Sequence, residues 1–528
     1  MDAPPTGVLH DRALRRDQRA EPAADPTPPA MLTALVTSHC VDMRRALGDR
    51  GPRMDAQRVI ARRMVIGIPP DGLSPAWEKD FAQFPPAGVI LFAARDFKDL
   101  ADARRVISRL RELARPRRLF VSLDEEGGWV SQLAGHLTVP PNAATLARAA
   151  DAETLRWIAG VTARRLHALG FDWDFAPVAD VHSEPDNPVI GPRAWGTTPA
   201  QVTANAGAWL AGFQGSGVAT CVKHAPGHGD TRTDSHLALP VCDADLATLE
   251  AREFVPFRAH AAADSLMTAH VVYPALDPGV PATFSRAIVQ GVLRERLGFR
   301  GVVITDALEM QGAAAGRTPA EAGLAALAAG CDLLLYAHWN EDVRRARYTM
   351  ADAVVEGRVD RELFDATRPR LAAFDAAHAE PTADELATPL EQLTPRDWES
   401  RLAGLIDRAL AVSGRAPAAD GGWRVLEESE WKQGPTFAAS LRDAGIPDGG
   451  ASPAADVFAI ASRIPLTPER IAAMRAHAST RPTILVGLQN DRFLDHVPEA
   501  ALRISAADCT PLTRRVVAER LAALRTSA

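Results

Sequence analysis

The sequence predicts an α/β protein: a (β/α)8 TIM-type barrel followed by a small C-terminal α/β domain. Two observations carry this prediction. Eight short runs of apolar and β-branched residues alternate with helical stretches between residues 63 and 337, and such runs are typical of parallel strands covered on both faces. Polar residues follow most of the runs, as at the carboxyl ends of barrel strands, where active groups lie. A doubly wound sheet is the alternative, and the count of eight favours the barrel.

The elements follow in order along the chain. The predicted barrel strands are residues 63–68, 88–92, 119–124, 171–178, 218–224, 265–272, 301–307 and 331–337. Helical patterns lie between them, for example over 99–114 and 244–254. Two further apolar runs, 457–462 and 483–488, predict the sheet of the C-terminal domain. That domain shows no catalytic constellation, so we expect it to have a structural or partner-binding role.

These patterns divide the chain into four parts. We expect a largely disordered N-terminal tail over 1–55, with a helix near 31–47 in an otherwise unpatterned segment. The catalytic barrel should occupy 56–378. A linker-like stretch over 379–400 should lead into the small α/β domain at 401–528.

Composition restricts the class of protein. The 528 residues, 47% of them hydrophobic, are enough for a large barrel and a smaller domain. The net charge of −7 argues against nucleic acid as the main partner. Five scattered cysteines suggest neither a disulfide framework nor a zinc motif. No apolar run is long enough for a membrane span, and the start lacks a secretory core, so we expect a cytoplasmic enzyme. The sequence leaves the oligomeric state open.

The segment 221–240 is the most distinctive in the chain. A buried strand delivers Lys223 and His224 to its carboxyl end, and Pro226 stops the strand. The polar loop that follows carries Asp234 and His236. Two residues apart, the carboxylate can orient the imidazole and favour its protonated form, which makes His236 a candidate proton donor. A solvated polar loop or a metal site is the alternative interpretation.

Polar side chains follow the other predicted strands as well. The candidates at strand ends are Asp124, Asp180, Lys223, His224, His270 and Asp306. In a barrel these groups converge on one pocket. Asp306 directly follows apolar and β-branched residues. A carboxylate in this position can also serve as a helix N-cap, so no single one is decisive.

The segment from Lys223 to His236 resembles the signature of family 3 glycoside hydrolases, in the β-N-acetylhexosaminidase branch. It reads Lys-His-x-Pro-Gly-His-Gly-Asp-Thr-x-x-Asp-Ser-His. The resemblance implies that His236 is the general acid/base and that Asp234 pairs with it. The Thr-Asp-x-Leu-x-Met context of Asp306 is similar to that of the family's nucleophile. Ala225 and Ala307 depart from the usual pattern without touching these roles.

Three more segments are similar to the family, and the resemblance extends over roughly 60–380. It implies that Asp124 accepts sugar hydroxyls and that Arg193 is a sugar ligand, and it includes His270; we expect Lys223 and His224 to bind substrate too. Charge-assisted hydrogen bonds suit sugar hydroxyls. A structural ion pair, such as Asp124 with Lys223, is the alternative. Trp129 and Gln132 stand where the family commonly has arginines, which leaves the exact sugar open.

The predicted function is that of a retaining exo-β-N-acetylglucosaminidase acting on cell-wall (peptidoglycan) fragments. Asp306 would form a glycosyl-enzyme and His236 would act as acid and then base, with no metal or cofactor. If His236 were not the acid/base, Glu125 and Glu126 would be the next candidates. Alternatives on the same scaffold are a phosphorylase or a β-glucosidase. A non-catalytic sugar-binding barrel is the alternative from another class. The loop 226–240 is expected to be mobile.

Overall fold

The computed structural model describes residues 52–526, except Ala94, 236–237, Ala315, Asp360, 418–420, 431–433, 451–452 and Arg463. The predicted tail lies outside the described residues up to position 51, and so does the helix expected near 31–47. The candidate acid/base His236 lies outside them as well. Residues 52–55 belong to helix α2 (Pro52–Ala61).

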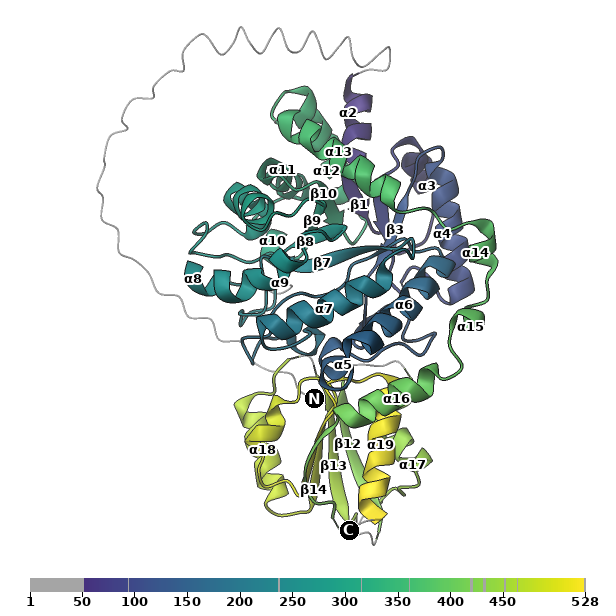
Figure 1. Ribbon diagram of the computed structural model, residues 1–528, viewed down its shortest axis with the longest axis vertical. Helices are drawn as coiled ribbons and strands as arrows, with labels where there is room; N and C mark the ends of the chain where they lie inside the picture. The colour runs from purple at the N-terminus through teal and green to yellow at the C-terminus, as the bar shows by residue number, and fades with distance from the viewer. Residues whose placement is uncertain are drawn as a thin grey trace, which may run out of the picture. The chain divides into compact units, whose positions relative to one another are not determined.

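Eight parallel strands close into a barrel, which confirms the predicted fold (Figure 1). In barrel order they are β1 (Met64–Ile66), β2 (Gly88–Ile90), β3 (Phe120–Leu123), β6 (Trp173–Asp174), β7 (Ala219–Ala225), β8 (Ser265–Thr268), β9 (Val302–Ala307) and β10 (Leu333–Tyr336). The pairing of Met64 with Leu334 closes the ring between the first strand and the last. All eight predicted strands are present, so the doubly wound alternative is excluded.

The fourth barrel strand is much shorter than its predicted range of 171–178. Beyond Asp174, the carbonyls of Ala176 and Pro177 still accept the N–H groups of Cys221 and Lys223. Pro177 has no N–H to offer in return, so the regular ladder stops. The chain nevertheless stays close to β7 up to the bridge between Val178 and Lys223.

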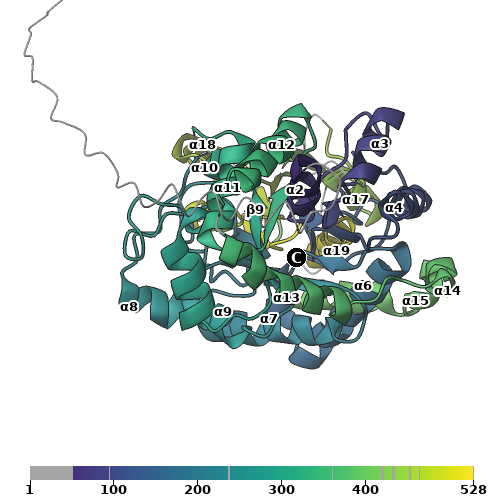
Figure 2. The same ribbon diagram turned by 90° about the horizontal axis from the view of Figure 1, so that it is seen from above.

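Helices surround the barrel (Figure 2). They are α3 (Pro75–Gln83), α4 (Leu100–Ala114), α5 (Ala143–Ala149), α6 (Ala152–Leu169), α7 (Pro199–Phe213), α8 (Leu246–Thr248), α9 (Phe254–Ala259), α10 (Gln311–Ala314), α11 (Pro319–Ala329), α12 (Glu341–Val355) and α13 (Arg361–Ala377). Two wider helical turns, η2 (Leu249–Glu253) and η4 (Ala287–Arg296), and two short 3-10 turns, η1 (Gly191–Arg193) and η3 (Ala282–Phe284), complete the set. Several helices begin at polar caps: Asp99 accepts the N–H of Asp102, and Thr318 forms a capping box with Glu321.

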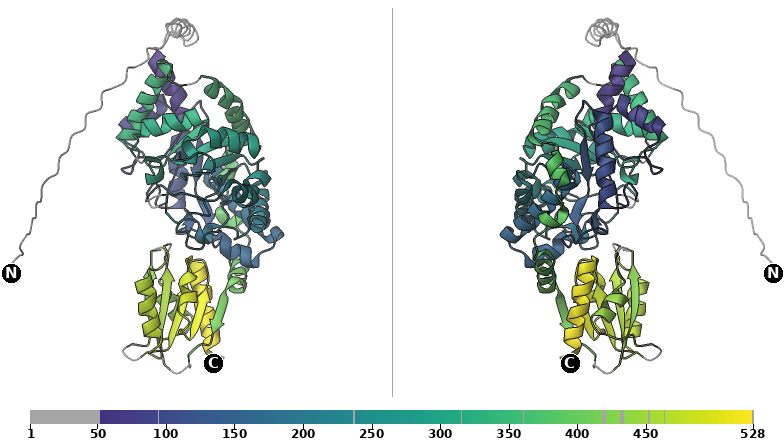
Figure 3. Two further views of the ribbon diagram at one scale, coloured as in Figure 1. Left: turned by 90° about the vertical axis from the view of Figure 1, so that its left-hand side faces the viewer. Right: turned by 90° about the vertical axis from the view of Figure 1, so that its right-hand side faces the viewer.

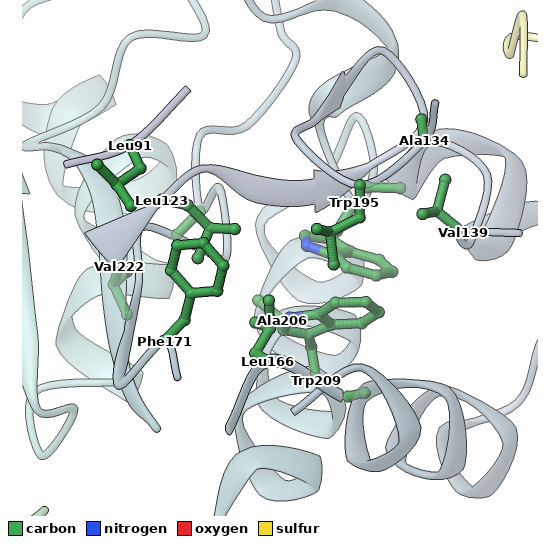
Figure 4. Close-up of a cluster of buried hydrophobic side chains, with 14 of the residues drawn as sticks. Leu91, Leu123, Ala134, Val139, Leu166, Phe171, Trp195, Ala206, Trp209 and Val222 are labelled. Carbon is green, nitrogen blue, oxygen red and sulfur yellow. The ribbon is translucent and has the colours of Figure 1, made fainter. Parts of the chain in front are cut away.

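Apolar side chains fill the barrel and the layer between its strands and helices. Inside the ring, Trp173 and Phe175 pack edge to face with ring centroids 4.9 Å apart. In the outer layer, Trp195 and Trp209 pack with centroids 5.4 Å apart, and Figure 4 shows Leu166 beside this pair. Such packing fixes the strand ends that carry polar groups.

The C-terminal part contains a five-stranded sheet with helices on both faces. The strand order is β11 (Ala411–Gly414), β15 (Leu502–Ser505), β14 (Thr483–Gly487), β13 (Ala455–Ala461) and β12 (Trp423–Ser429), with only β11 antiparallel. Helix α18 (Pro468–Ala478) lies on one face, and α17 (Phe437–Asp443) and α19 (Pro511–Thr526) lie on the other (Figure 1). Figure 3 shows this sheet from two further sides. A small α/β domain is therefore present, as predicted.

Three helices occupy the stretch between α13 and β11. They are α14 (Ala383–Ala387), α15 (Leu390–Leu393) and α16 (Trp398–Ala409). The first begins in a capping box of Thr382 and Glu385. This is a local helix signal inside the stretch 379–400, which was predicted to be linker-like. None of the helices in the described ranges has the length and apolar composition of a membrane span.

Four of the five cysteines lie in the described ranges, and all four are buried as free thiols. They are Cys221, Cys242, Cys331 and Cys509. Burial raises the pKa of Cys221 and of Cys242 to about 12. It also raises the pKa values of Cys331 and Cys509. These thiols behave as small apolar groups in the core.

Candidate active site

A cavity of about 530 Å³ lies at the carboxyl ends of the barrel strands. Five of the eight predicted site residues line it: Asp124, Arg193, Lys223, His224 and Asp306. They come from the carboxyl ends of three barrel strands, β3, β7 and β9, and from η1, so positions far apart in the sequence line one cavity. The convergence expected from strand-end chemistry is therefore present.

Lys223 is the electrostatic centre of the cavity. Its side chain is only 2% exposed, and Nζ lies 2.6 Å from Asp124 Oδ1 and 2.6 Å from Glu126 Oε1. Burial alone would lower the pKa of Lys223, but these two carboxylates outweigh it and raise the pKa. The ion pair between Asp124 and Lys223, considered as an alternative to sugar binding, is thus present. It also fixes the Asp124 carboxylate at the cavity wall.

Arg193 is held by Glu126. Its Nε and one terminal nitrogen donate to the two carboxylate oxygens at 2.8 and 2.7 Å, a bidentate pair. Burial would raise the pKa of Glu126, but Arg193 and Lys223 lower it to about 2. Glu126 is therefore ionised at neutral pH and unsuited to be a general acid.

Glu125, the other alternative acid/base, lies beside the cavity without lining it. Its carboxylate is buried and accepts the Ser131 hydroxyl at 2.6 Å and the Gln132 N–H at 2.9 Å. Burial raises the pKa of Glu125 to about 7, because the hydrogen bonds to its ionised form only partly offset the loss of water. Its contacts are those of a residue that supports the hairpin of β4 (Glu125–Gly127) and β5 (Val130–Ser131).

His224 is oriented by Asp180. The ring Nδ1 lies 2.8 Å from Asp180 Oδ2. Within the described part of the chain, Nε2 is therefore the ring nitrogen that remains to bind a ligand. Asp180 also accepts the backbone N–H groups of His224 and His228, the latter at 2.7 Å. Burial would raise the pKa of Asp180, but His224 and these bonds lower it. Asp180 is thus an ionised positioning group behind His224.

Asp306 is the next-to-last residue of β9, so it lies within the strand rather than after it. Its Oδ1 accepts the N–H of Ala307 at 2.7 Å, which helps to orient the carboxylate. His270, by contrast, does not line the cavity. Its Nε2 donates to the Ala307 carbonyl at 3.0 Å, and its Nδ1 lies 2.8 Å from the Thr283 hydroxyl. His270 thus holds the backbone beside Asp306, and its predicted contact with substrate stays a prediction.

The loop after β7 is anchored up to Ser235. His228 bridges Thr231 at 2.8 Å and Ser235 at 3.1 Å, and burial lowers the pKa of His228 to about 4. At Gly229, a Cβ atom would lie 1.7 Å from the Val181 carbonyl, so this close approach requires glycine. Asp234 is buried at 4% exposure, and Ser235 lines the cavity. The Asp234–His236 pair, and the mobility expected for 226–240, concern residues that are in part outside the described ranges.

The cavity is also lined by residues that were not among the predicted site residues. Trp129 and Phe92 line it, and so do Glu309 and His338, whose carboxylate oxygen and backbone N–H are 2.7 Å apart. His338 follows closely on the eighth strand, so the strand-end rule extended by one strand would have found it. Gln132 does not line the cavity. Its Oε1 accepts the Ala93 N–H at 2.9 Å.

A carboxylate at a barrel strand end, among fixed hydrogen-bonding groups in one cavity, is the arrangement of a barrel enzyme that acts on a polar substrate. The chain belongs to glycoside hydrolase family 3. Residues 76–374, more than half of the chain, match the family model described as the glycosyl hydrolase family 3 N-terminal domain. The predicted family is thereby confirmed.

Curated relatives and solved structures agree with this assignment. A β-hexosaminidase of Methylococcus capsulatus is 40% identical over 266 residues, covering 49% of this chain and 78% of that protein. One from Chromobacterium violaceum is 36% identical over 328 residues, covering 60% and 83%. A family 3 β-N-acetylglucosaminidase structure from a Paenibacillus species has a TM-score of 0.79 at 27% identity, covering 89% of this chain and 96% of that one. A β-glucoside phosphorylase, at 18% identity and a TM-score of 0.74, shares the fold.

Proposed function

We propose that the protein is a retaining exo-β-N-acetylglucosaminidase that hydrolyses terminal β-linked N-acetylglucosamine. One observation carries the proposal: the Asp306 carboxylate lies in the same cavity as Asp124, Lys223 and His224. The family membership supports hydrolysis of glycosides. The names of the β-hexosaminidase relatives and of the β-N-acetylglucosaminidase structure support the amino sugar.

In the proposed mechanism, Asp306 attacks the anomeric carbon and the leaving oxygen takes a proton from His236. Water then attacks the glycosyl-enzyme after giving a proton to the same ring, and Asp306 is released. Asp234 orients the ring and favours its protonated form. Ser235, the chain neighbour of His236, lines the cavity, which supports this role. The low pKa of Glu126 and the buried position of Glu125 weigh against the two carboxylate alternatives.

The sugar itself meets three fixed groups. Asp124 and Arg193 line the cavity, and ion pairs with Lys223 and Glu126 restrict their side chains. His224, oriented by Asp180, presents its Nε2. Groups already held in place lose little freedom when a ligand binds, so they suit recognition of hydroxyls by charge-assisted bonds. We propose cell-wall fragments as the natural substrates and the cytoplasm as the location.

Turnover of aryl β-N-acetylglucosaminide and aryl β-glucoside, each with and without phosphate, tests the proposal. We expect the amino sugar to be the better substrate and phosphate to leave the rate unchanged. A phosphate requirement with formation of a sugar 1-phosphate would make the enzyme a phosphorylase. A preference for the glucoside would make it a β-glucosidase. No turnover combined with sugar binding would favour the non-catalytic alternative.

A mechanism-based fluorosugar tests the nucleophile separately. We expect mass spectrometry to find the label on Asp306, and Asp306→Ala to lower turnover by at least about 10³-fold while the protein still folds. Three other carboxylates line the cavity: Asp124, Glu126 and Glu309. Labelling of any of these would overturn the assignment of Asp306.

A further inference from the structure

The turn of the β4–β5 hairpin forms part of the cavity wall. Gly128 and Trp129 make the turn, and Trp129 lines the cavity. Glu126, in the same hairpin, holds both Lys223 and Arg193. The position of this turn therefore affects one side of the cavity and the base of its charge network.

The turn rests on Asn142. The Trp129 N–H donates to Asn142 Oδ1 at 2.9 Å, and the Gly128 N–H donates to the Pro140 carbonyl at 2.8 Å. Gly128 has a φ of 55°, and a Cβ atom there would lie 2.0 Å from Asn142 Oδ1. Only glycine allows the backbone to come so close to this side chain.

Asn142 is in turn held by a segment after β15, in the C-terminal part of the chain. Its Nδ2 donates to the Ala507 carbonyl at 2.9 Å, and its backbone N–H donates to Asp508 Oδ1 at 3.1 Å. An amide has one donor end and one acceptor end, so the bond to Ala507 fixes which end faces Trp129. Ala507 has a φ of 54°, a left-handed conformation that is unfavourable for a residue other than glycine.

Two further features indicate that this arrangement is not a by-product of helix formation. Asn142 stands at the N-cap of α5, where an asparagine side chain usually accepts an N–H of the first turn, yet it makes no such bond. Asp508 is itself fixed, because it accepts the hydroxyls of Thr510 and Thr513. Asn142 and Asp508 are 1% and 0% exposed, so water does not compete for these bonds.

We infer that Asn142 is a positioning residue through which Ala507 and Asp508 fix Trp129 and so shape the substrate cavity. The C-terminal domain then contributes to substrate binding without touching the substrate. The inference rests on the proposed function only for the identity of the sugar. Loss of the connection should weaken binding of ground state and transition state alike, which raises KM and leaves kcat nearly unchanged.

Asn142→Ala in the full chain tests the inference, with Thr145→Val as the matched control. Thr145 lies on the same helix, is also buried, and donates its hydroxyl to the Ala506 carbonyl at 2.9 Å. It thus makes a similar bond to the same segment, but it makes no hydrogen bond to the hairpin turn. We expect Asn142→Ala to raise KM for the aryl glycoside roughly tenfold, with kcat within about twofold. Thr145→Val should leave KM unchanged, although both variants lower Tm.

Equal effects of the two variants on KM, or an unchanged KM in Asn142→Ala, would show a purely structural role and overturn the inference. Asn142→Ser supplies a good helix cap but cannot span both contacts, so it replaces Asn142→Ala if that variant does not fold.

Hydrogen exchange of the amides in residues 125–133 gives a readout that needs no turnover. We expect faster exchange in Asn142→Ala and wild-type exchange in Thr145→Val. If the wild-type enzyme cleaves no aryl glycoside, the proposed function fails, while the exchange experiment still decides the role of Asn142. Unchanged exchange in Asn142→Ala would refute that role.

Discussion

Lys223 shows how one buried charge can organise a cavity. A single ammonium satisfies Asp124 and Glu126, and Glu126 then holds Arg193 in a bidentate pair. Removing the ammonium leaves the carboxylates of Asp124 and the buried Glu126 with one guanidinium between them. When one partner of a buried ion pair is removed, the protein loses more stability than the intact pair contributes, because the remaining charge is uncompensated.

Lys223→Met should therefore lower the free energy of unfolding by about 3–5 kcal/mol and reduce kcat/KM by at least about 10²-fold. Chemical denaturation and steady-state kinetics would measure the two effects. Lys79→Met provides the control, because Lys79 is exposed on α3, and a change there should stay within about 0.5 kcal/mol. A stable and fully active Lys223→Met variant would contradict the role assigned to this residue.

Residue types and spacing indicated which strand-end residues could share a cavity, but they indicated only part of the pairing among these residues. The strand-end positions of Asp124, Lys223 and His224 were evident from the apolar runs before them. The ion pair of Asp124 with Lys223 was foreseen as an alternative. The partners of His224 and Arg193 were not: Asp180 binds His224, and Glu126 binds Arg193, from segments distant in sequence. Such contacts depend on the closed ring of strands. His270 illustrates the same limit, because a strand-end histidine turns out to bind backbone.

Among the elements, the contact between the loop after β7 and η2 contains a buried carboxylate, Glu253, whose ionisation should depend on pH. A Cβ atom at Gly227 would lie 2.8 Å from Glu253 Oε2, so the loop backbone covers this carboxylate. Arg252 donates to the other oxygen. Burial raises the pKa of Glu253 to about 7, against the opposing effect of Arg252.

A raised carboxylate pKa makes the folded state bind more protons than the unfolded state between pH 4.5 and about 7. The contribution of Glu253 to stability therefore falls as pH rises through that window, by on the order of 1–3 kcal/mol. We expect Glu253→Gln to remove this decline. The unfolding free energy of the variant should therefore increase relative to that of the wild type between pH 4.5 and 7.5. Urea titrations at several pH values would show it.

Glu295→Gln is the control, because Glu295 is exposed in η4 and should leave the pH profile unchanged. A Glu253→Gln profile parallel to that of the wild type would mean that Glu253 is ionised throughout.

Element boundaries were predicted less well than element types. All eight barrel strands were found, but the fourth was expected to be longer, since sequence periodicity does not register the loss of a ladder donor at Pro177. The stretch 379–400 was read as a linker because of its prolines and polar residues. The capping box at Thr382 shows that a helix of five residues can begin even there. Short elements depend on caps and contacts more than on periodicity.

For the molecule as a whole, the closed barrel and the C-terminal sheet followed from the sequence because apolar runs determine both. The function of the C-terminal part did not follow, because it contains no catalytic constellation. The contribution that we infer for it depends on the main-chain carbonyl of Ala507 and the buried carboxylate of Asp508. A main-chain carbonyl has no signature in a sequence.

The four buried thiols can report when the region around each of them opens. A thiol with a raised pKa, shielded from solvent, reacts with iodoacetamide only when its surroundings open. Three of the four lie in the barrel part and Cys509 lies beside the contact with Asn142. Labelling each thiol over time in mild denaturant would therefore time the opening of each region. We expect Cys509 and Cys221 to react at the same rate if the two regions open together. Earlier labelling of Cys509 would mean that the C-terminal segment releases the cavity wall while the barrel is still closed.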